Sequence, residues 1–118
     1  MKYMLLIYQD EKVLDDASME ACYNESMQLA QTLKSNGQLL GVSPLQPVAM
    51  ATSVRVRDGK RLITDGPFAE TREQLGGYFL VEAKDLDEAI GIAGRIPGAR
   101  KGTVEIRPVV ELASMAGM

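Results

Sequence analysis

The side chains best suited to chemistry lie close together in one segment, Asp65–Tyr78. Asp65 opens this segment in an Asp-Gly-Pro turn, and Arg72 follows within a short stretch that is rich in charge. An aspartate acts as a general base when burial or a like-charged neighbour raises its pKa toward the working pH. The planar guanidinium of an arginine suits a bidentate carboxylate or phosphate. Asp65 and Arg72 are therefore candidates for an acid–base group and an anion anchor.

Each of these two candidates also has a plainer interpretation. Aspartate is a standard turn residue, so Asp65 could simply cap the turn at Gly66-Pro67. Arg72 could form a surface ion pair with Glu70, Glu73 or another acid, and exposed pairs of this kind are weak. The residues alone leave both interpretations open at each position.

Three further side chains complete the candidate ligand-binding set. Gly76-Gly77 lets another part of the backbone approach closely just before the next strand, so that a pocket can form here. The candidate contacts to a ligand are Glu70, Gln74 and Tyr78, together with Arg72. A tyrosine hydroxyl can donate to a ligand oxygen, although strand tyrosines more often pack in a core or an interface.

The residue types give no prediction of a metal or a cofactor. The chain has no His and a single Cys, Cys22. Within one chain this excludes His-dependent nucleophilic sites, His metal centres, a disulfide and thiolate zinc sites. Glu70 and Glu73 would share one side of a helical turn, but with Asp65 they form too generic a set for a divalent cation. We therefore predict no metal and no cofactor, and a buried, inert thiol at Cys22 on the apolar stripe of a helix.

Composition and charge narrow the class of partner. The chain has 118 residues and a formal net charge of -3, with a sequence pI of about 4.9, whereas nucleic-acid binding favours a basic surface. No apolar run approaches the ~20 residues that cross a bilayer. The apolar opening Met1–Tyr8 is too short for a signal peptide and has no small-residue cleavage site before Asp10. We expect a cytoplasmic protein that binds neither nucleic acid nor a membrane.

The elements that position the candidate segment follow from apolar patterning. Continuous apolar runs predict buried strands, and apolar residues at helical spacing behind an aspartate cap predict helices. Asp85 with Glu88 forms a pair of the capping-box type. The predicted order is strand 3–8, helix 15–36, a short strand from 39, hairpin 53–64, strand 78–83, a helix from 85 that ends before Pro97, and strand 103–109.

The hairpin turns at Asp58-Gly59, a pair that suits the two positive φ angles of a type I′ turn. Alternation around it predicts one solvated face. Without the hairpin the order is βαββαβ, which is typical of an α+β, ferredoxin-like fold with two helices on one face of an antiparallel sheet. The other face then needs a cover, and dimerisation through it is one solution. We predict a single domain over residues 1–112 and a flexible tail at 113–118.

Several stretches resemble one known family. Thr64–Thr71 and Gln74–Tyr78 are similar to the central motif of the DGPF-domain branch of the YCII-related family, and Met1–Tyr8 resembles its opening strand. The start of the second helix, Asp85–Ala89, and the last strand, Val104–Pro108, are also similar. The resemblance implies a ferredoxin-like fold, a dimeric α/β barrel and a link to sigma-factor-associated regulation. Members often carry a His where this chain has Lys101, so a His-dependent mechanism does not transfer.

Three hypotheses about function follow. The first is a small homodimeric protein that binds a small molecule in a pocket between sheet and helices, rimmed by the loop at Asp65–Phe68. The second is a His-independent enzyme with Asp65 as acid or base and Arg72 as anion anchor. The third is a protein-interaction module that contacts a regulatory protein partner. Burial of Asp65 together with Arg72 in a closed pocket would favour ligand binding or catalysis.

Overall fold

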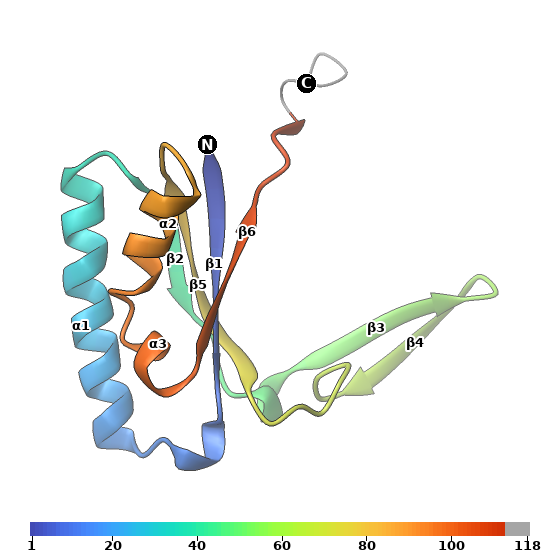
Figure 1. Cartoon of the computed structure of the whole chain (residues 1–118). Helices are drawn as coiled ribbons and strands as arrows, with labels where there is room; N and C mark the ends of the chain where they lie inside the picture. Colours follow the sequence, from blue (N-terminus) through green and yellow to red (C-terminus); the bar gives the residue numbers. More distant parts are fainter. Residues whose placement is uncertain (113–118) are drawn as a thin grey trace.

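The computed structural model describes residues 1–112, and the predicted tail at 113–118 lies outside the described residues. A four-stranded antiparallel sheet has the order β2-β5-β1-β6, and two further strands form a separate hairpin (Figure 1). The strands of the sheet are β1 (Lys2–Gln9), β2 (Leu39–Pro44), β5 (Gln74–Glu82) and β6 (Thr103–Pro108), and those of the hairpin are β3 (Thr52–Arg57) and β4 (Lys60–Asp65). The helices are α1 (Asp16–Ser35), α2 (Leu86–Ala93) and α3 (Gly98–Lys101), with 3-10 turns at Glu11–Val13 and Val48–Met50. This architecture confirms the predicted α+β, ferredoxin-like class.

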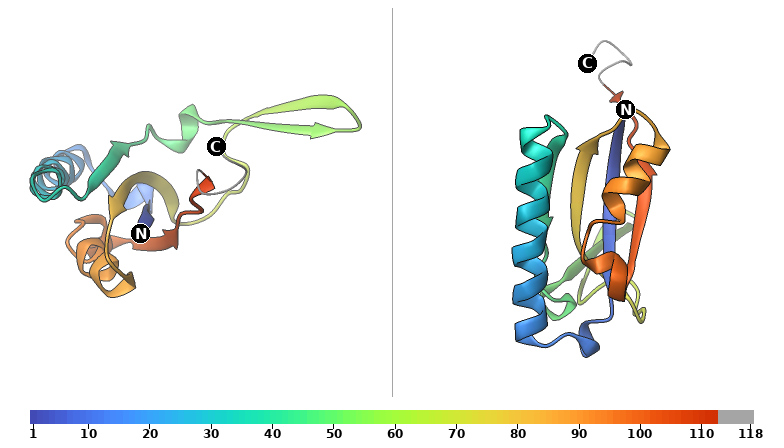
Figure 2. Two further views of the ribbon diagram at one scale, coloured as in Figure 1. Left: turned by 90° about the horizontal axis from the view of Figure 1, so that it is seen from above. Right: turned by 60° about the vertical axis from the view of Figure 1, so that its left-hand side comes forward.

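The helices cover one face of the sheet and leave the other without a helix (Figure 2). In the central pair, Leu5 lies opposite Phe79 and Tyr3 opposite Val81, and all four side chains are buried. Alternate residues of these strands lie on the opposite, helix-free face, where Met4 and Leu6 and their partners in β5 are half-buried. The predicted placement of the helices on one face is therefore confirmed.

The first helix begins at its predicted aspartate cap and ends, close to its predicted boundary, just before a glycine. The Asp15 carboxylate accepts from the backbone N–H of Ser18 at 2.7 Å, which satisfies one of the free donors of the first turn. At the other end Gly37 has a φ of +72°, the left-handed conformation that glycine adopts without strain. Leu29 and Leu33 then pack from α1 into the core.

The second helix has the predicted capping pair. The Asp85 carboxylate accepts from the backbone N–H of Glu88 at 2.9 Å, and the Glu88 carboxylate accepts in return from the N–H of Lys84 at 3.2 Å. These reciprocal bonds orient α2 so that Ala89 and Ile92 reach the core.

Three features of the fold differ from the prediction, one additional helix and two strand boundaries. α3 was not predicted, because Pro97-Gly98 was interpreted only as a helix end, although proline is compatible with the start of a new helix. β5 begins at Gln74 and not at Tyr78, since pairing with Gln9 and Leu45 extends the strand back through the glycines. Asp65 closes β4 opposite Thr52 and does not open a loop.

The turn of the hairpin was predicted correctly, but the burial of its strands was not. Asp58 and Gly59 have φ angles of +53° and +75°, as a type I′ turn requires. One face was expected to be covered, yet Val54 and Ile63 are 59% and 61% exposed. The reason is that β3 and β4 pair with each other and extend away from the four-stranded sheet (Figure 1).

Candidate functional site

Two adjoining cavities lie between the first half of α1 and the sheet. One has a volume of ≈ 190 Å³ and includes Glu11 in its wall, and we call it the Glu11 cavity. The other has a volume of ≈ 210 Å³ and includes Met27, and we call it the Met27 cavity. The two share four wall residues, Gln9, Cys22, Tyr23 and Gly76. They therefore form one continuous candidate site.

Glycines allow the backbone to approach closely around the Met27 cavity. A Cβ on Gly77 would lie 3.0 Å from the carbonyl oxygen of Ser43 in β2. A Cβ on Gly98 would lie only 2.6 Å from Cγ2 of Ile7. Both glycines and both contact residues line this cavity. The close packing of β2 against β5, and of α3 against β1, thus fixes the floor of the site.

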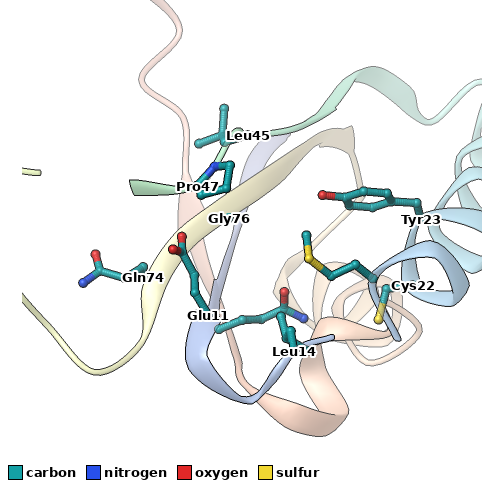
Figure 3. A pocket seen from close by; sticks show the side chains of 10 residues that line it. Glu11, Leu14, Cys22, Tyr23, Leu45, Pro47, Gln74 and Gly76 are labelled. Carbon is teal, nitrogen blue, oxygen red and sulfur yellow. The ribbon is translucent and has the colours of Figure 1, made fainter. Parts of the chain in front are cut away.

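The wall of the Glu11 cavity comes from elements far apart in the sequence. Figure 3 shows Cys22 and Tyr23 reaching from α1, with Leu45 and Pro47 across from them in the segment after β2. The Glu11 carboxylate is held in place because Oε2 accepts from the backbone N–H of Val48 at 3.1 Å. This bond ties the segment after β1 to the segment after β2, and both segments line the cavity.

The walls are mostly apolar, with a few polar groups. Gln9, Gln74 and Glu11 contribute two amides and a carboxylate, and Cys22 contributes a free thiol. Among the described residues that line the two cavities there is no lysine and no arginine. The site is suited to an apolar molecule that carries an uncharged polar group.

The ion pair of Glu25 with Arg100 holds α3 beside α1. Two hydrogen bonds join the guanidinium to the carboxylate, at 2.9 and 2.7 Å. These bonds lower the pKa of Glu25 and raise that of Arg100. The N–H of Ser18 likewise lowers the pKa of Asp15, with a smaller contribution from Lys101 in α3. The charged forms of both acids are therefore favoured, and in these forms they stabilise α1, which forms one wall of the site.

The structure divides the predicted site residues. Gln74 lines the Glu11 cavity, and Tyr78 contributes to the wall of the Met27 cavity, although it alternates with buried Phe79 and so lies on the helix-free side next to Leu6. Asp65 and Glu70 are exposed and line neither cavity.

Arg72 also lies outside both cavities, with its side chain 90% exposed. Its Nε atom lies 3.6 Å from Oδ2 of Asp10. This acid is neither Glu70 nor Glu73, and the carboxylate of Glu73 accepts instead from Thr103 at 2.9 Å. The structure therefore does not bring Asp65, Glu70 and Arg72 together in an enclosed site.

Sequence reasoning missed most of the cavity wall. Cys22 was expected to be a buried thiol, yet it is half-buried and borders both cavities. Tyr23 and Met27 are 42% and 57% exposed on α1. A run of apolar residues on one helix that is wider than its packing needs is the signal that could have pointed to this wall.

Within residues 1–112 no group of three or more Cys, Asp or Glu side chains could hold a metal ion. No helix there is both long and apolar enough to cross a membrane.

Two comparisons with known proteins bear on the chain. A sequence model of the YCII-related domain matches residues 1–113. An uncharacterized protein of Rhizobium meliloti (strain 1021) is 35% identical over 114 residues, which is 92% of this chain and 92% of the relative. Both matches span nearly the whole length over which the fold is described.

Proposed function

The chain belongs to the YCII-related family, and from that premise we propose that it binds a small molecule in the adjoining Glu11 and Met27 cavities. The observation that carries this proposal is the half-enclosed, mainly apolar space between α1 and the sheet, with a few polar groups in its wall. Ligand sites have this composition, with apolar walls for affinity and a few polar groups for orientation.

Size and charge restrict the ligand. An apolar cavity of ~150 Å³ is enough to hold benzene, so volumes of ≈ 190 and ≈ 210 Å³ suit a molecule of one or two rings. An anion would be unfavourable, because the charged side chain of the wall is Glu11 and no cation lines either cavity among the described residues. The proposed ligand is therefore an uncharged, apolar ring compound with a hydroxyl or amide group within reach of Gln9 or Gln74.

The test is a binding measurement with a matched pair of probes. 2-Naphthol and 2-naphthoate share the same rings, but at pH 7 the first is neutral and the second is an anion. We expect 2-naphthol to raise the melting temperature of the protein. The same rise should need at least a tenfold higher concentration of 2-naphthoate. Equal potency of the two probes, or no shift with either, would contradict the proposed ligand class.

A variant that fills the site locates the binding. Ser26 lines the Met27 cavity, so Ser26→Leu places an apolar side chain in the space that the probe needs. Ser35→Leu is the matched control, because Ser35 is exposed at the end of the same helix. The shift with 2-naphthol should disappear in Ser26→Leu and persist in Ser35→Leu. Persistence in both variants would place the probe elsewhere.

A homodimer through the helix-free face of the sheet is part of the same proposal. This face carries Met4 opposite Leu80 and Leu6 opposite Tyr78, and these apolar side chains are half-buried. Dimerisation would remove them from water, which is the main favourable term in such association.

Two further expectations stay proposals that rest on the family resemblance, membership of the DGPF branch through Asp65–Phe68 and a link to sigma-factor-associated regulation. A cytoplasmic location also stays a proposal, and it rests on the apolar patterning of the sequence. The hypothesis that Asp65 acts as acid or base beside an anion held by Arg72 also stays a prediction. Because both side chains are exposed, a substrate held by them would lie outside the two cavities.

A further inference from the structure

The hairpin β3–β4 has two chemically different faces. Val54 lies opposite Ile63, with Val56 next along the same face, and these three side chains are between 58% and 61% exposed. The alternate positions form the other face, where Arg55, Arg57 and Lys60 lie around Leu62. Arg61 lies opposite Val56 on the first face, and Asp65 lies opposite Thr52 at its base. The first face is therefore apolar around the pair Val54 and Ile63, and the other face carries three of the four basic side chains of the ribbon.

The chain itself gives this ribbon little support. β3 and β4 pack chiefly on each other, and two hydrogen bonds anchor the ribbon at its base. There Ser53 Oγ donates to the carbonyl of Gly66 at 2.8 Å, and the N–H of Gly66 donates to the carbonyl of Ala51 at 2.7 Å. A two-stranded ribbon alone in water is marginally stable, and a third strand or a surface packed against it adds stability. A surface from outside the chain would provide that packing.

The shape of the chain indicates how much surface is left uncovered. The radius of gyration is 16.2 Å, whereas a compact domain of this length has about 13 Å. The accessible surface is 8339 Å², against about 6300 Å² for a compact monomer of the same mass, an excess of about 2000 Å². Permanent homodimers bury about 1000 to 2500 Å² on each partner. The excess is thus similar in size to the area that one partner buries in a permanent homodimer.

Charge indicates which partner would cover the hairpin. Residues 52–65 contain four basic and two acidic side chains, a charge of +2. The whole chain has a net charge of -3, so the remainder has -5. A basic arm on an acidic body is attracted to the body of another copy of the same chain. A double-stranded nucleic acid would satisfy the basic face but would leave Val54, Val56 and Ile63 in water.

We propose that the hairpin is an exchanged arm, which lies against the body of a second copy of this chain with its apolar face covered. The hairpin leaves the body on the side away from the helices, which is the side of the helix-free sheet face (Figure 2). A copy seated on that face lies within reach of the arm. The inference rests on the proposed dimer and adds a second, symmetric contact to it, since each arm meets the other body.

The test compares two sets of exposed apolar side chains. Val54→Ser with Ile63→Ser removes the apolar face of the arm, and neither side chain is needed for the core because both are more than half exposed. Ile90→Ser is the matched control, an isoleucine that is 51% exposed on α2. In sedimentation equilibrium the double variant should raise the dimer dissociation constant on the order of a hundredfold or more, because two arms lose two side chains each. The control should leave it within about threefold.

A charge variant gives an independent readout. Arg55→Gln with Arg57→Gln should weaken the dimer in dilute buffer, and the difference from the unaltered protein should shrink in 1 M NaCl, where charges are screened within about 3 Å. Weakening that is equal at both salt concentrations would overturn the charge argument for a second copy.

Hydrogen exchange distinguishes a dimer contact made by the arm from one made by the sheet face. Amides of residues 52–65 should gain protection as the protein is concentrated into the dimer, and the apolar double variant should lose that gain. A dimer whose arm amides exchange as fast as in the monomer would overturn the arm and leave the sheet-face dimer standing. A monomer at high concentration would overturn both, and a mixed-sequence DNA duplex that protects the arm would overturn the choice of partner. Binding of 2-naphthol is measured separately, so the proposed ligand site stands or falls on its own.

Discussion

Replacing Gly98 by alanine places one methyl group where α3 meets β1. The new Cβ would lie 2.6 Å from Cγ2 of Ile7 and 3.1 Å from Nε2 of Gln9. The glutamine can swing its terminal amide away. Cγ2 of Ile7 cannot move as easily, because it branches from Cβ on a central strand and isoleucine is stiff at χ1. Either the helix or the strand side chain must shift.

The expected loss of stability is moderate. Overpacking a core by a methyl group costs roughly 1–3 kcal/mol, while removing a glycine from the unfolded chain returns about 0.4–1 kcal/mol. The net cost is therefore about 1–2 kcal/mol. For a chain of 118 residues the entropy of unfolding is about 0.25 kcal/mol/K, so the melting temperature should fall by roughly 4–8 °C.

Calorimetry at a fixed protein concentration measures this change, with Gly91→Ala as the matched control. Gly91 lies within α2, and an added Cβ would meet nothing within 4 Å. There the substitution should raise stability by about 0.5–1 kcal/mol, since alanine is the better helix former. If Gly98→Ala were as stable as Gly91→Ala, the close approach of α3 to β1 would be wrong.

Three further predictions concern caps, charge and the exposed arginine. Asp85→Ala removes the acceptor for the N–H of Glu88 and should cost about 1 kcal/mol in urea denaturation; an unchanged midpoint would contradict the cap. The lowered pKa values of Asp15 and Glu25 stabilise the fold above their ordinary values of 3.8 and 4.5, and this contribution is lost as the pH falls through the lower folded values. In thermal melts the advantage over Asp15→Asn with Glu25→Gln should thus be constant near neutral pH and shrink in acid, and an advantage that persists in strong acid would refute the assignment. Arg72→Ala should change stability by no more than about 0.5 kcal/mol and leave the melting-temperature shift with 2-naphthol intact, because the Arg72 side chain is 90% exposed. Loss of that shift would show that Arg72 contributes to ligand binding.

Local chemistry accounts for what the sequence predicted well in the fold. Asp58-Gly59 specifies its turn because both positive φ angles belong to the two residues themselves. Asp85 and Glu88 cap a helix through atoms only a few residues apart. The order of strands and helices follows from apolar patterning in the same way, since each stretch shows its own period.

Long-range packing accounts for what the sequence did not predict. The start of β5 at Gln74 depends on pairing with β1 and β2, so a turn-rich composition was misleading there. The exposure of Val54 and Ile63 depends on where the hairpin is attached, which alternation along a strand does not specify. A strand pattern predicts that one face will be covered but not whether the same chain covers it.

The candidate site was predicted in part for the same reason. Gln74 and Tyr78 were selected from the segment of highest functional interest, and both contribute to the cavity walls. Gln9 and Cys22 come from β1 and α1 and meet these walls only in three dimensions. Asp65 was selected for its residue type. The sequence placed it directly after the predicted hairpin, but the exposure of that hairpin was not visible in the sequence.

A small apolar molecule bound between α1 and the sheet should shield the cysteine of α1 from reagents in solution. Cys22 borders both cavities and is the single cysteine of the chain, so its reaction rate with N-ethylmaleimide reports occupancy of this space. At ten times its dissociation constant, 2-naphthol should slow the reaction about tenfold if ligand and reagent exclude each other. An unchanged rate at saturating 2-naphthol would contradict the proposed site.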